Sequence, residues 1–427
     1  MEMKMKNRIF ATMLLMAAMT VPAAAQLTEE ELDRYAADTV YTDLQSYYEE
    51  QTAYNDMPGS QWAVQKQAAL DRLLEDRLLT TTQLGLMVYD LTDQHVVYRF
   101  NERQRMRPAS TQKLVSAITA LDMLGGNYKV HTYLRYGGDI SGGVLRGNLY
   151  CIGGMDPTFT ADDMKLFVEA VREAGITRVE GKVIADKSMK DDKKWGEGWC
   201  WDDDNPVLSP LLVDRKDQFA EVLVKQLRDK GITVTGGVAT GRAPQRLTEI
   251  ADFVTTLDQI LKRMMKNSDN LYAESVFYQV AAGNGPRPVS ARQGTAAVKR
   301  LIQRLGLPAG MYVVADGSGL SLYDYVTPEL MVRLLRHAYD NREIYEHLRP
   351  VLPVAGVDGT LKNRMQGTRA AGNVHAKTGT VTSVSALSGY LTASNGHLIC
   401  FSIINQGVIR ASDGRGFQDR VCEALCR

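Results

Sequence analysis

The amino-acid sequence predicts an α/β (α+β) fold in which a smaller α/β domain interrupts a larger one. Apolar strand pairs separated by short polar turns lie toward both ends of the chain, and long helical patterns lie between them. From about residue 136 the pattern changes to short β runs broken by glycines, with one helical pattern among them. We therefore expect 136–251 to be the inserted domain, and 26–135 together with 252–427 to form one discontinuous domain.

The first expected elements are a helix and a hairpin. Leucines at helical spacing predict a helix over 61–79. The apolar runs 84–91 and 95–100, separated by Thr-Asp-Gln, predict two paired strands. An apolar helical run then follows Ser110 and Lys113, so the expected order is strand, strand, helix.

Further helices are expected along the rest of the chain. Helical patterns at 162–175 and 217–231 lie in the region of the inserted domain, and another lies at 328–340. The long apolar stripe at 257–282 is interrupted by the polar residues 267–270. Such an interruption marks either a helix end or a site.

The last expected strands form a second hairpin, at 384–391 and 397–404. The tight turn between them contains Asn395 and Gly396, and we expect both to adopt the positive φ angles that such a turn needs. His-Ala-Lys-Thr-Gly-Thr stands just before the first of these strands.

Length and composition are those of a globular chain with two or three domains. The chain has 427 residues, of which 44% are hydrophobic and 23% are charged. The 50 basic residues equal the 50 acidic ones. This balance does not favour a nucleic acid or an anionic membrane surface as a partner.

The first 25 residues have the pattern of a secretory signal peptide. Lys4, Lys6 and Arg8 precede an apolar run that ends in small residues. This run is too short to span a bilayer, and no later segment offers a long uncharged run. We expect an exported protein without a transmembrane anchor in its mature form, and a polar helix over 28–50 whose role is open.

The five cysteines are too few and too scattered for a disulfide scaffold. We expect mostly buried thiols. Cys422 and Cys426 lie four residues apart, which leaves two interpretations, a disulfide bridge or two neighbours on one helix.

Ser110 and Lys113 suggest a nucleophile and its base. A serine hydroxyl is a weak nucleophile until a base removes its proton, and a lysine one helical turn further along lies on the same face. The N-terminus of the helix adds N–H groups and a positive potential that favour negative charge at the reacting centre. The lysine can act as base only if burial and a nearby cation lower its pKa, and Lys377 is the candidate cation.

The pair gains weight from two further motifs. Alone, Ser-x-x-Lys occurs by chance in any long chain and describes a solvated helix face. Here Ser268-Asp269-Asn270 and Lys377-Thr378-Gly379 follow in order. This ordered trio is typical of penicillin-binding proteins and serine β-lactamases.

Each motif has a role in acyl transfer. We expect Ser110 to attack the scissile carbonyl, Lys113 to take its proton, Ser268 to relay a proton to the leaving amine, and Asn270 to orient Lys113 and the substrate amide. The carboxylate and oxyanion sites are expected in the strand motif. Lys377 and Thr378 would hold the substrate's terminal carboxylate, Gly379 would let the ligand approach closely, and the N–H groups of Ser110 and Thr380 would form the oxyanion hole.

Longer stretches around these motifs resemble the penicillin-binding protein 4 type of D-alanyl-D-alanine carboxypeptidase and endopeptidase, the S13 serine peptidases. The stretches are GGMDPTF at 153–159, WGEGWCWDDD at 195–204, NSDNLYAE at 267–274, DGSGLS at 316–321 and LPVAGVDGTLKNRM at 352–365. The resemblance implies a transpeptidase/β-lactamase-like catalytic domain, with an antiparallel sheet between helices and an insertion between the first two motifs. It also implies peptidoglycan stem peptides as substrates, β-lactams as inhibitors and no cofactor.

The resemblance transfers less securely to substrate contacts. Members of the family place an acidic residue near the diaminopimelate amino group of the stem peptide, and Asp203 holds that position here. A solvated loop is the other interpretation, because Asp203 stands within a run of three aspartates. Some members have an arginine after Ser-Gly-Leu-Ser, where this chain has Leu322, so the preferred cross-link residue is open.

The leading hypothesis is a periplasmic serine D-Ala-D-Ala carboxypeptidase, with DD-endopeptidase activity left open. A serine β-lactamase is one alternative, against which the long insertion and the lack of a Glu-x-x-x-Asn element argue. An inactive peptidoglycan-binding scaffold is the other. The histidines lack the spacing of a zinc peptidase, so no metal is expected, and the oligomeric state is open.

Overall fold

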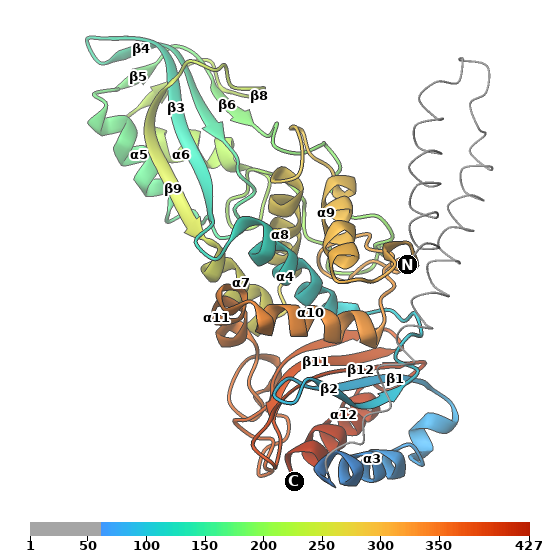
Figure 1. Ribbon diagram of the computed structural model, residues 1–427. Coiled ribbons are helices and arrows are strands. Elements are labelled where there is room, and N and C mark those ends of the chain that lie inside the picture. Colours follow the sequence, from blue (N-terminus) through green and yellow to red (C-terminus); the bar gives the residue numbers. More distant parts are fainter. Residues whose placement is uncertain (1–60) are drawn as a thin grey trace, which may run out of the picture. The chain divides into compact units, whose positions relative to one another are not determined.

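The computed structural model describes residues 61–427 (Figure 1). The predicted signal peptide, 1–25, and the predicted polar helix, 28–50, lie outside the described residues. Within the described part of the chain, no helix combines the length and the apolar character needed to cross a membrane. The elements form two sheets with their covering helices, as the α/β (α+β) class requires.

The first sheet has five antiparallel strands in the order β10-β11-β12-β1-β2. Both predicted hairpins are present, and pairing of β1 with β12 joins them into one sheet. Strands far apart in the sequence therefore lie side by side. The strands are β1 (Gln83–Asp90), β2 (His95–Phe100), β10 (His375–Val381), β11 (Val384–Thr392) and β12 (Leu398–Gln406).

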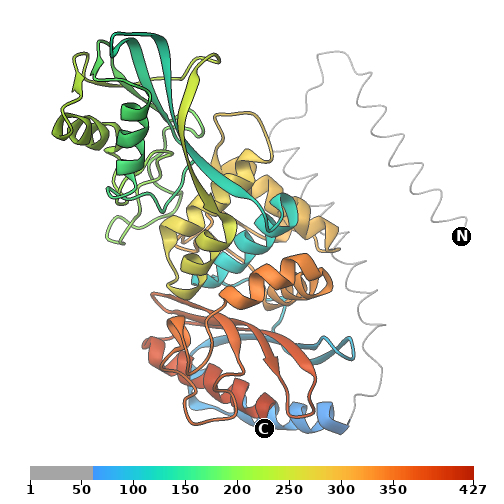
Figure 2. The ribbon, with the colours of Figure 1, turned by 90° about the vertical axis from the view of Figure 1, so that its left-hand side faces the viewer.

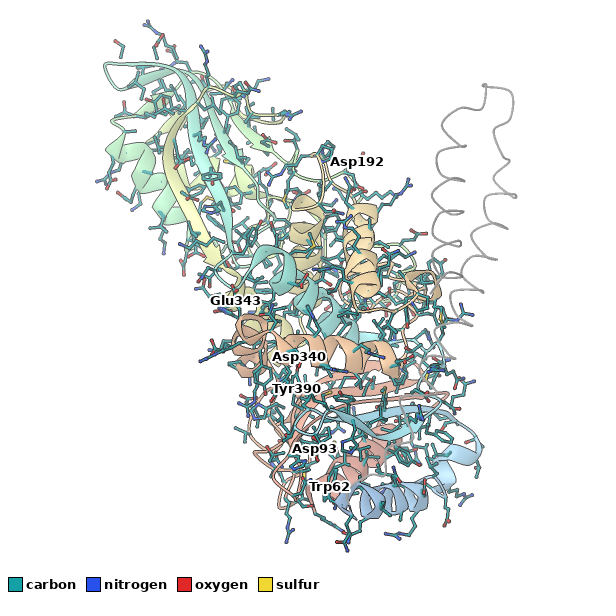
Figure 3. The ribbon with its side chains drawn as sticks, viewed as in Figure 1. Trp62, Asp93, Asp192, Asp340, Glu343 and Tyr390 are labelled. Carbon is teal, nitrogen blue, oxygen red and sulfur yellow. The ribbon has the colours of Figure 1, made fainter. Side chains whose placement is uncertain are left out.

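Helices cover both faces of this sheet. α3 (Gln61–Leu73) and α12 (Ala411–Cys426) lie on one face, and α10 (Pro328–Asp340) lies on the other (Figure 1). The Tyr390 hydroxyl of β11 donates a hydrogen bond to the Leu335 carbonyl of α10 at 2.7 Å, on the side of the sheet that faces this helix (Figure 3). Because both faces are covered, β11 and β12 are buried along almost their whole length. The expected antiparallel sheet between helices is confirmed.

A layer of helices next to α10 carries the first two motifs. α4 (Gln112–Leu124) and α8 (Asn270–Ala282) pack against each other and are buried on nearly all sides, which explains apolar residues all around them. A 3-10 turn, η2 (Ala109–Thr111), leads into α4. The other helices here are α7 (Leu257–Lys266), α9 (Ala291–Arg304) and α11 (Arg342–Val351).

The second sheet is formed by the chain between 129 and 256. Its path is β7-β5-β4-β3-β9, and β6 pairs with β4 and β8. α5 (Met164–Glu173) and α6 (Phe219–Asp229) pack together beside it around a core that includes Phe159 and Phe167 (Figure 2). The strands are β3 (Lys129–Ser141), β4 (Val144–Ile152), β5 (Arg178–Val179), β6 (Val183–Asp186), β7 (Thr233–Val234), β8 (Val238–Thr240) and β9 (Thr248–Thr256).

The predicted borders of the inserted domain fall inside strands of this second sheet. The border at 135/136 lies within β3 and the border at 251/252 lies within β9, and these two strands pair antiparallel. The region has its own sheet and its own hydrophobic core. The division of the chain into domains stays a prediction.

The helix expected over 61–79 is too long. α3 ends at Leu73, and a separate 3-10 turn, η1 (Arg77–Thr80), follows. The Asp76 carboxylate accepts a hydrogen bond from the N–H of Leu78 at 2.8 Å and so caps the new turn. A local side-chain hydrogen bond therefore overrides the leucine periodicity.

The prediction for Asn395 is wrong. In the turn between β11 and β12, Gly396 has a φ of 87°, whereas Asn395 does not adopt a positive φ. The Asn395 side chain instead accepts a hydrogen bond from the N–H of His397 at 3.1 Å. Asparagine thus stabilises this turn through its side chain, and the glycine alone supplies the left-handed backbone.

All five cysteines are free, and four of them are buried. Cys422 and Cys426 both lie on α12. The prediction of mostly buried thiols is confirmed, and the helical interpretation of this pair is the correct one.

Candidate active site

Ser110 lies in η2, at the point where the chain enters α4. The backbone before it is strained, because Ala109 has a φ of 47°, a left-handed conformation that residues with a Cβ rarely adopt. Lys113 follows in the first turn of α4, and its Nζ lies 3.0 Å from Ser110 Oγ. The predicted nucleophile and base are therefore within hydrogen-bond distance.

Lys113 is fully buried and has three polar neighbours. Its Nζ lies 3.0 Å from Ser110 Oγ, 2.7 Å from Asn270 Oδ1 and 2.8 Å from the Ser318 carbonyl oxygen. Burial lowers the pKa of Lys113 to about 8, although the carboxyl groups around it, Asp316 foremost, act in the opposite direction. A substantial fraction of this amine is neutral near pH 8, as a general base requires.

The source of the lowered pKa differs in part from the expectation. Burial acts on Lys113 as predicted, but the charge of Lys377 is not among the main causes. Instead, Lys113 acts on Lys377. Burial holds the pKa of Lys377 well below its ordinary value, and the positive charge of Lys113 lowers this pKa further.

The second motif occupies the break between α7 and α8. Ser268 has a φ of 59°, so the chain turns sharply here. Asp269 is the N-cap of α8 and accepts a hydrogen bond from the N–H of Leu271 at 3.1 Å. Asn270 begins α8 and accepts a hydrogen bond from Lys113. The polar interruption of the helical stripe is thus both a helix end and part of the candidate site.

The third motif lies on β10. Lys377 is fully buried, and its Nζ donates hydrogen bonds to Ser268 Oγ at 2.9 Å and to the Thr378 carbonyl at 2.7 Å. The Thr378 hydroxyl, which is half-buried, donates to Thr360 Oγ1 at 2.7 Å. Thr360 was not predicted. The structure therefore brings all three motifs together, through Ser110 with Lys113, Lys113 with Asn270, and Lys377 with Ser268.

Gly379 was predicted to let the ligand approach β10 closely, whereas in the structure it lets η2 approach β10 closely. A Cβ at this position would lie 2.7 Å from the Pro108 carbonyl oxygen and 3.1 Å from the Thr111 nitrogen. The missing side chain thus lets β10 pack directly against η2. Thr380 is exposed on the same strand, so the two N–H groups predicted for the oxyanion hole belong to segments that touch.

Asp203 is the one predicted site residue that the structure does not bring to the others. It lies exposed in the loop after Trp199, and its side chain makes no hydrogen bond or ion pair with the described residues. The loop itself reaches the site, because Trp199 Nε1 donates to the Asp316 carboxylate at 2.8 Å. The role of Asp203 stays a prediction.

The third partner of Lys113 comes from the segment 316–321, which the sequence linked to the family resemblance without predicting this contact. Asp316 is buried, and its carboxylate accepts hydrogen bonds that fold the following residues so that the Ser318 carbonyl meets Lys113. The sequence Asp-Gly-Ser-Gly at 316–319 is a turn signal that could have indicated such a backbone contact. The donors are the N–H groups of Ser318 (3.0 Å), Gly319 (2.7 Å) and Ser321 (2.8 Å), the Ser318 hydroxyl (3.2 Å) and Trp199 Nε1 (2.8 Å).

Two more carboxyl groups are buried near Lys113. Burial raises the pKa of Glu274 to about 8, and burial together with the charge of Asp316 raises the pKa of Asp324 well above its ordinary value. Glu274 is therefore mostly protonated near pH 7. This limits the negative charge beside Lys113, which would otherwise hold its proton more strongly.

The sequence model of the D-Ala-D-Ala carboxypeptidase 3 (S13) family matches residues 66–212 and 204–426. The chain belongs to this family. The family assignment that the motifs and their flanks predicted is therefore confirmed.

Individual members of the family are similar along most of their length. D-alanyl-D-alanine carboxypeptidase DacB of Haemophilus influenzae is 27% identical, over 77% of this chain and 86% of the relative. The crystal structure of penicillin binding protein 4 (dacB) from Haemophilus influenzae has a TM-score of 0.76 at 25% identity, and the match covers 83% of this chain and 98% of that chain. The structure of the same protein complexed with a novel β-lactam has a TM-score of 0.70 at 26% identity, with 82% and 97% covered. These matches confirm the transpeptidase-like fold.

Proposed function

We propose that the protein is a serine-type D-Ala-D-Ala carboxypeptidase that acts on peptidoglycan stem peptides through an acyl-enzyme on Ser110. The position of Lys113 carries this proposal, because its Nζ lies 3.0 Å from the Ser110 hydroxyl and 2.7 Å from Asn270 Oδ1. An amine of lowered pKa within hydrogen-bond distance of a hydroxyl forms a nucleophile and base pair. Family membership supplies the substrate class.

The first step transfers the acyl group to Ser110. Neutral Lys113 accepts the hydroxyl proton while Oγ attacks the carbonyl carbon between the two D-Ala residues. The N–H groups of Ser110 and Thr380 stabilise the oxyanion. When the C–N bond breaks, the proton that Lys113 accepted passes through Ser268, whose hydroxyl contacts Lys377, to the leaving amine, and Lys113 is neutral again.

The second step returns the enzyme to its starting state. A water molecule attacks the ester carbonyl, and Lys113 again accepts a proton. The C–O bond to Ser110 breaks, Lys113 returns the proton to Ser110 Oγ, and the shortened stem peptide leaves. Each turnover thus consumes one water molecule and releases one D-Ala.

Lys377 and Thr378 bind the terminal carboxylate of the substrate in this proposal. Burial keeps the pKa of Lys377 well below its ordinary value in the free enzyme. A carboxylate placed beside the amine favours its protonated form, so substrate binding would itself charge Lys377. Asp203, on its exposed loop, remains the candidate contact for the free amino group of the stem peptide.

The proposal places the enzyme in the periplasm. The positively charged start and short apolar run of residues 1–25 support export. Cell fractionation with sequencing of the mature N-terminus tests this. A protein that retains residues 1–25 in the cytoplasm would contradict it.

Acylation by a penicillin tests the nucleophile. The purified protein is incubated with excess benzylpenicillin, and the adduct is located by peptide mass spectrometry. We expect one penicilloyl group on Ser110 and none in the Ser110→Ala variant. In parallel, a peptide ending in D-Ala-D-Ala should lose its last residue only with the unmodified enzyme. No adduct and no released D-Ala would refute the proposal.

Product analysis separates this function from its alternatives. Sustained nitrocefin hydrolysis would indicate a β-lactamase, whereas a stoichiometric burst indicates a peptidase. Mass spectrometry of muropeptides distinguishes loss of D-Ala from cleavage of cross-links, which would show endopeptidase activity. A scaffold would bind sacculi equally well with and without the Ser110 hydroxyl.

A further inference from the structure

Arg215 lies on a tight turn in residues 129–256, which contain the second sheet and are called the second-sheet region below. Val213 and Lys216 exchange backbone hydrogen bonds at 3.0 and 2.9 Å around it. Both central residues are left-handed, Asp214 with a φ of 46° and Arg215 with a φ of 65°. This conformation is costly for an arginine, so the surrounding structure must hold it in place.

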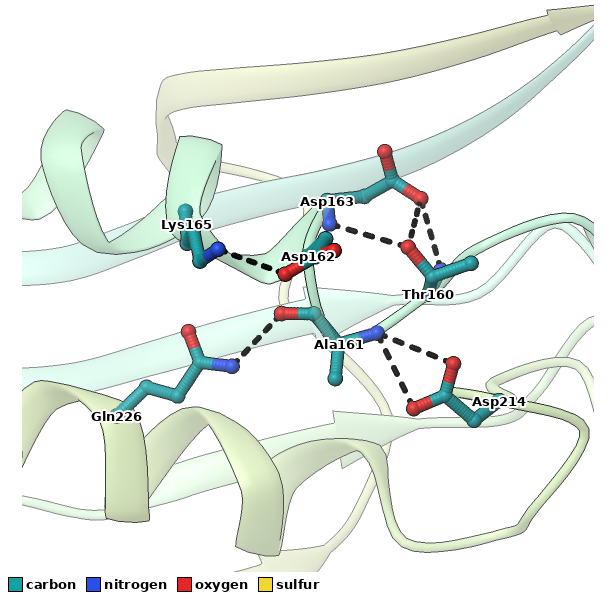
Figure 4. A network of polar contacts seen from close by, with 7 residues as sticks. All are labelled: Thr160, Ala161, Asp162, Asp163, Lys165, Asp214 and Gln226. Carbon is teal, nitrogen blue, oxygen red and sulfur yellow. Dashed lines mark hydrogen bonds and ion pairs between the residues drawn. The ribbon is translucent and has the colours of Figure 1, made fainter.

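The turn is anchored to the segment that leads into α5. The N–H of Asp214 donates to the Phe159 carbonyl at 3.0 Å. The Asp214 carboxylate accepts the N–H of Ala161, with both oxygens at 3.3 Å, and Gln226 of α6 donates to the Ala161 carbonyl at 2.8 Å (Figure 4). Arg215 is therefore presented from a fixed base.

The Arg215 side chain reaches the second catalytic motif. Its Nη1 and Nη2 donate to the two Asp269 carboxylate oxygens at 2.8 and 3.2 Å, and Arg263 Nε donates to the same carboxylate at 3.0 Å. The Asp269 side chain is only 8% exposed. Burial alone would raise the pKa of Asp269, but the two arginines, Arg215 foremost, lower it below its ordinary value.

Asp269 stands between two proposed catalytic residues. Ser268 before it is left-handed and contacts Lys377, and Asn270 after it contacts Lys113. Fixing the Asp269 carboxylate therefore fixes the backbone from which both side chains project. Arg263 belongs to the adjacent helix α7, whereas Arg215 comes from the region between the first two motifs.

We propose that Arg215 is a positioning residue through which the second-sheet region holds the Ser268–Asn270 segment in its reactive geometry. The inference rests on the proposed function. One arginine is enough to neutralise the charge of the Asp269 carboxylate, so the second arginine there has a further effect. The two-pronged contact of Arg215 adds orientation, because a guanidinium that binds both oxygens fixes the plane of the carboxylate.

The charge of Arg215 has a second consequence at Lys113. The carboxyl groups that act on Lys113 are Asp316, Glu274, Asp269 and Asp324, and each favours the protonated form of Lys113 when it is itself ionised. Without Arg215, only Arg263 would offset the Asp269 charge. The pKa of Lys113 would rise, and a higher pH would be needed to reach the neutral base.

Kinetics of the full enzyme test the proposal. In Arg215→Gln we expect kcat for D-Ala release to fall by roughly 10-fold or more while KM stays within about 2-fold, since reacting groups would be misaligned and not lost. The pH at which the rate reaches half its maximum should move upward. Arg215→Lys keeps the charge without the two-pronged contact, so it should restore the pH profile and only part of kcat.

The matched control is Arg228→Gln. Arg228 is an exposed arginine on α6 and makes no ion pair among the described residues, so kcat, KM and the pH profile should match the unmodified enzyme. Asp269→Asn retains a capping side chain and removes the charge. In that background Arg215→Gln should have no further effect on kcat, because the two residues act through one contact.

The outcomes separate this inference from the proposed function. Equal kcat and pH profile in Arg215→Gln and Arg228→Gln, or an undiminished effect of Arg215→Gln beside Asp269→Asn, would overturn the positioning role. A fall in kcat that merely follows a loss of folded protein in thermal melts would overturn it too. Failure of the proposed function looks different, because the unmodified enzyme would then neither release D-Ala nor bind penicillin.

Discussion

The protonation state of Lys113 decides the chemistry at the scale of single residues. A base must be neutral to accept the Ser110 proton, and an ordinary lysine is almost fully charged at pH 7. Burial lowers the pKa of Lys113 to about 8, against the pull of the carboxyl groups headed by Asp316. The Ser318 carbonyl and Asn270 Oδ1 accept hydrogen bonds that keep the amine oriented toward Ser110.

The rate of acylation should therefore depend on pH. A pKa of about 8 leaves about a tenth of Lys113 neutral at pH 7 and about nine tenths at pH 9, so acylation should reach half its maximum near pH 8 and level off above about pH 9. Stopped-flow acylation by a chromogenic cephalosporin between pH 5 and 10 measures this. Lys113→Arg, which stays charged, should lower the rate at least about 100-fold at every pH. A rate that does not change from pH 6 to 9 would contradict the role of Lys113 as base.

The site residues with reactive side chains could be predicted from the sequence, because each belongs to a short motif with fixed spacing. Ser110, Lys113 and Lys377 are examples. The Ser318 carbonyl could not be predicted this way. A backbone oxygen has no residue signature, and the hydrogen bonds of Asp316 that place it depend on the folded loop.

At the scale of elements, the contact of β10 with η2 sets the spacing between the nucleophile and the carboxylate site. Gly379 is the point of contact, because a Cβ there would lie 2.7 Å from the Pro108 carbonyl. The same two elements carry the N–H groups proposed for the oxyanion hole. A small displacement of β10 should therefore affect catalysis more than folding.

Gly379→Ala should reduce acylation while the protein stays folded. The new methyl group must push β10 away from η2, and misplacing the oxyanion donors should cost about 10- to 1,000-fold in the acylation rate. Gly416→Ala on the exposed side of α12 is the matched control, since its methyl group meets only the end of an arginine side chain at 3.6 Å. Acylation rates and circular dichroism melts of both variants provide the measurement. Equal acylation rates would show that the contact does not matter.

Periodicity predicted most elements correctly and failed where side chains bond to nearby backbone. The stripe at 257–282 yielded α7 and α8 with their break at the polar residues. Asp76 illustrates this failure, because its hydrogen bond to the N–H of Leu78 caps a separate turn. The side-chain hydrogen bond of Asn395 likewise accompanies the failed prediction of its φ angle, which came from turn residues. Such bonds depend on exact backbone geometry, which hydrophobic spacing does not encode.

At the scale of the whole molecule, the pairing of β1 with β12 completes the first sheet. Both hairpins could be predicted from apolar runs separated by short turns. Their pairing could not be predicted, because strands more than 300 residues apart carry no local signal for each other. The family resemblance predicted an antiparallel sheet between helices but not which strands pair in it. The sequence likewise indicated an insertion from its glycine-rich texture but not the strand path of the second sheet.

The two hydrophobic cores predict how the molecule unfolds. Phe401 lies in the core of the five-stranded sheet and Phe167 lies in the core of the second sheet, and both are almost completely buried. If 136–251 is a separate domain, calorimetry should resolve two transitions. Phe401→Ala should lower the free energy of unfolding for one transition, and Phe167→Ala should lower it for the other, each by about 3–5 kcal/mol.

Penicillin bound to Ser110 identifies the transition that belongs to the catalytic elements. The acyl group would contact α4 and β10, and β10 is a strand of the five-stranded sheet. Acylation should therefore raise the midpoint temperature of the transition that Phe401→Ala destabilises. Through the contact of Arg215 with Asp269, acylation should also raise the midpoint temperature of the other transition by a smaller amount. Arg215→Gln should remove this smaller increase. One transition that moves as a whole in every variant would instead mean that 61–427 unfold as a single cooperative unit, and the predicted division into domains would be wrong.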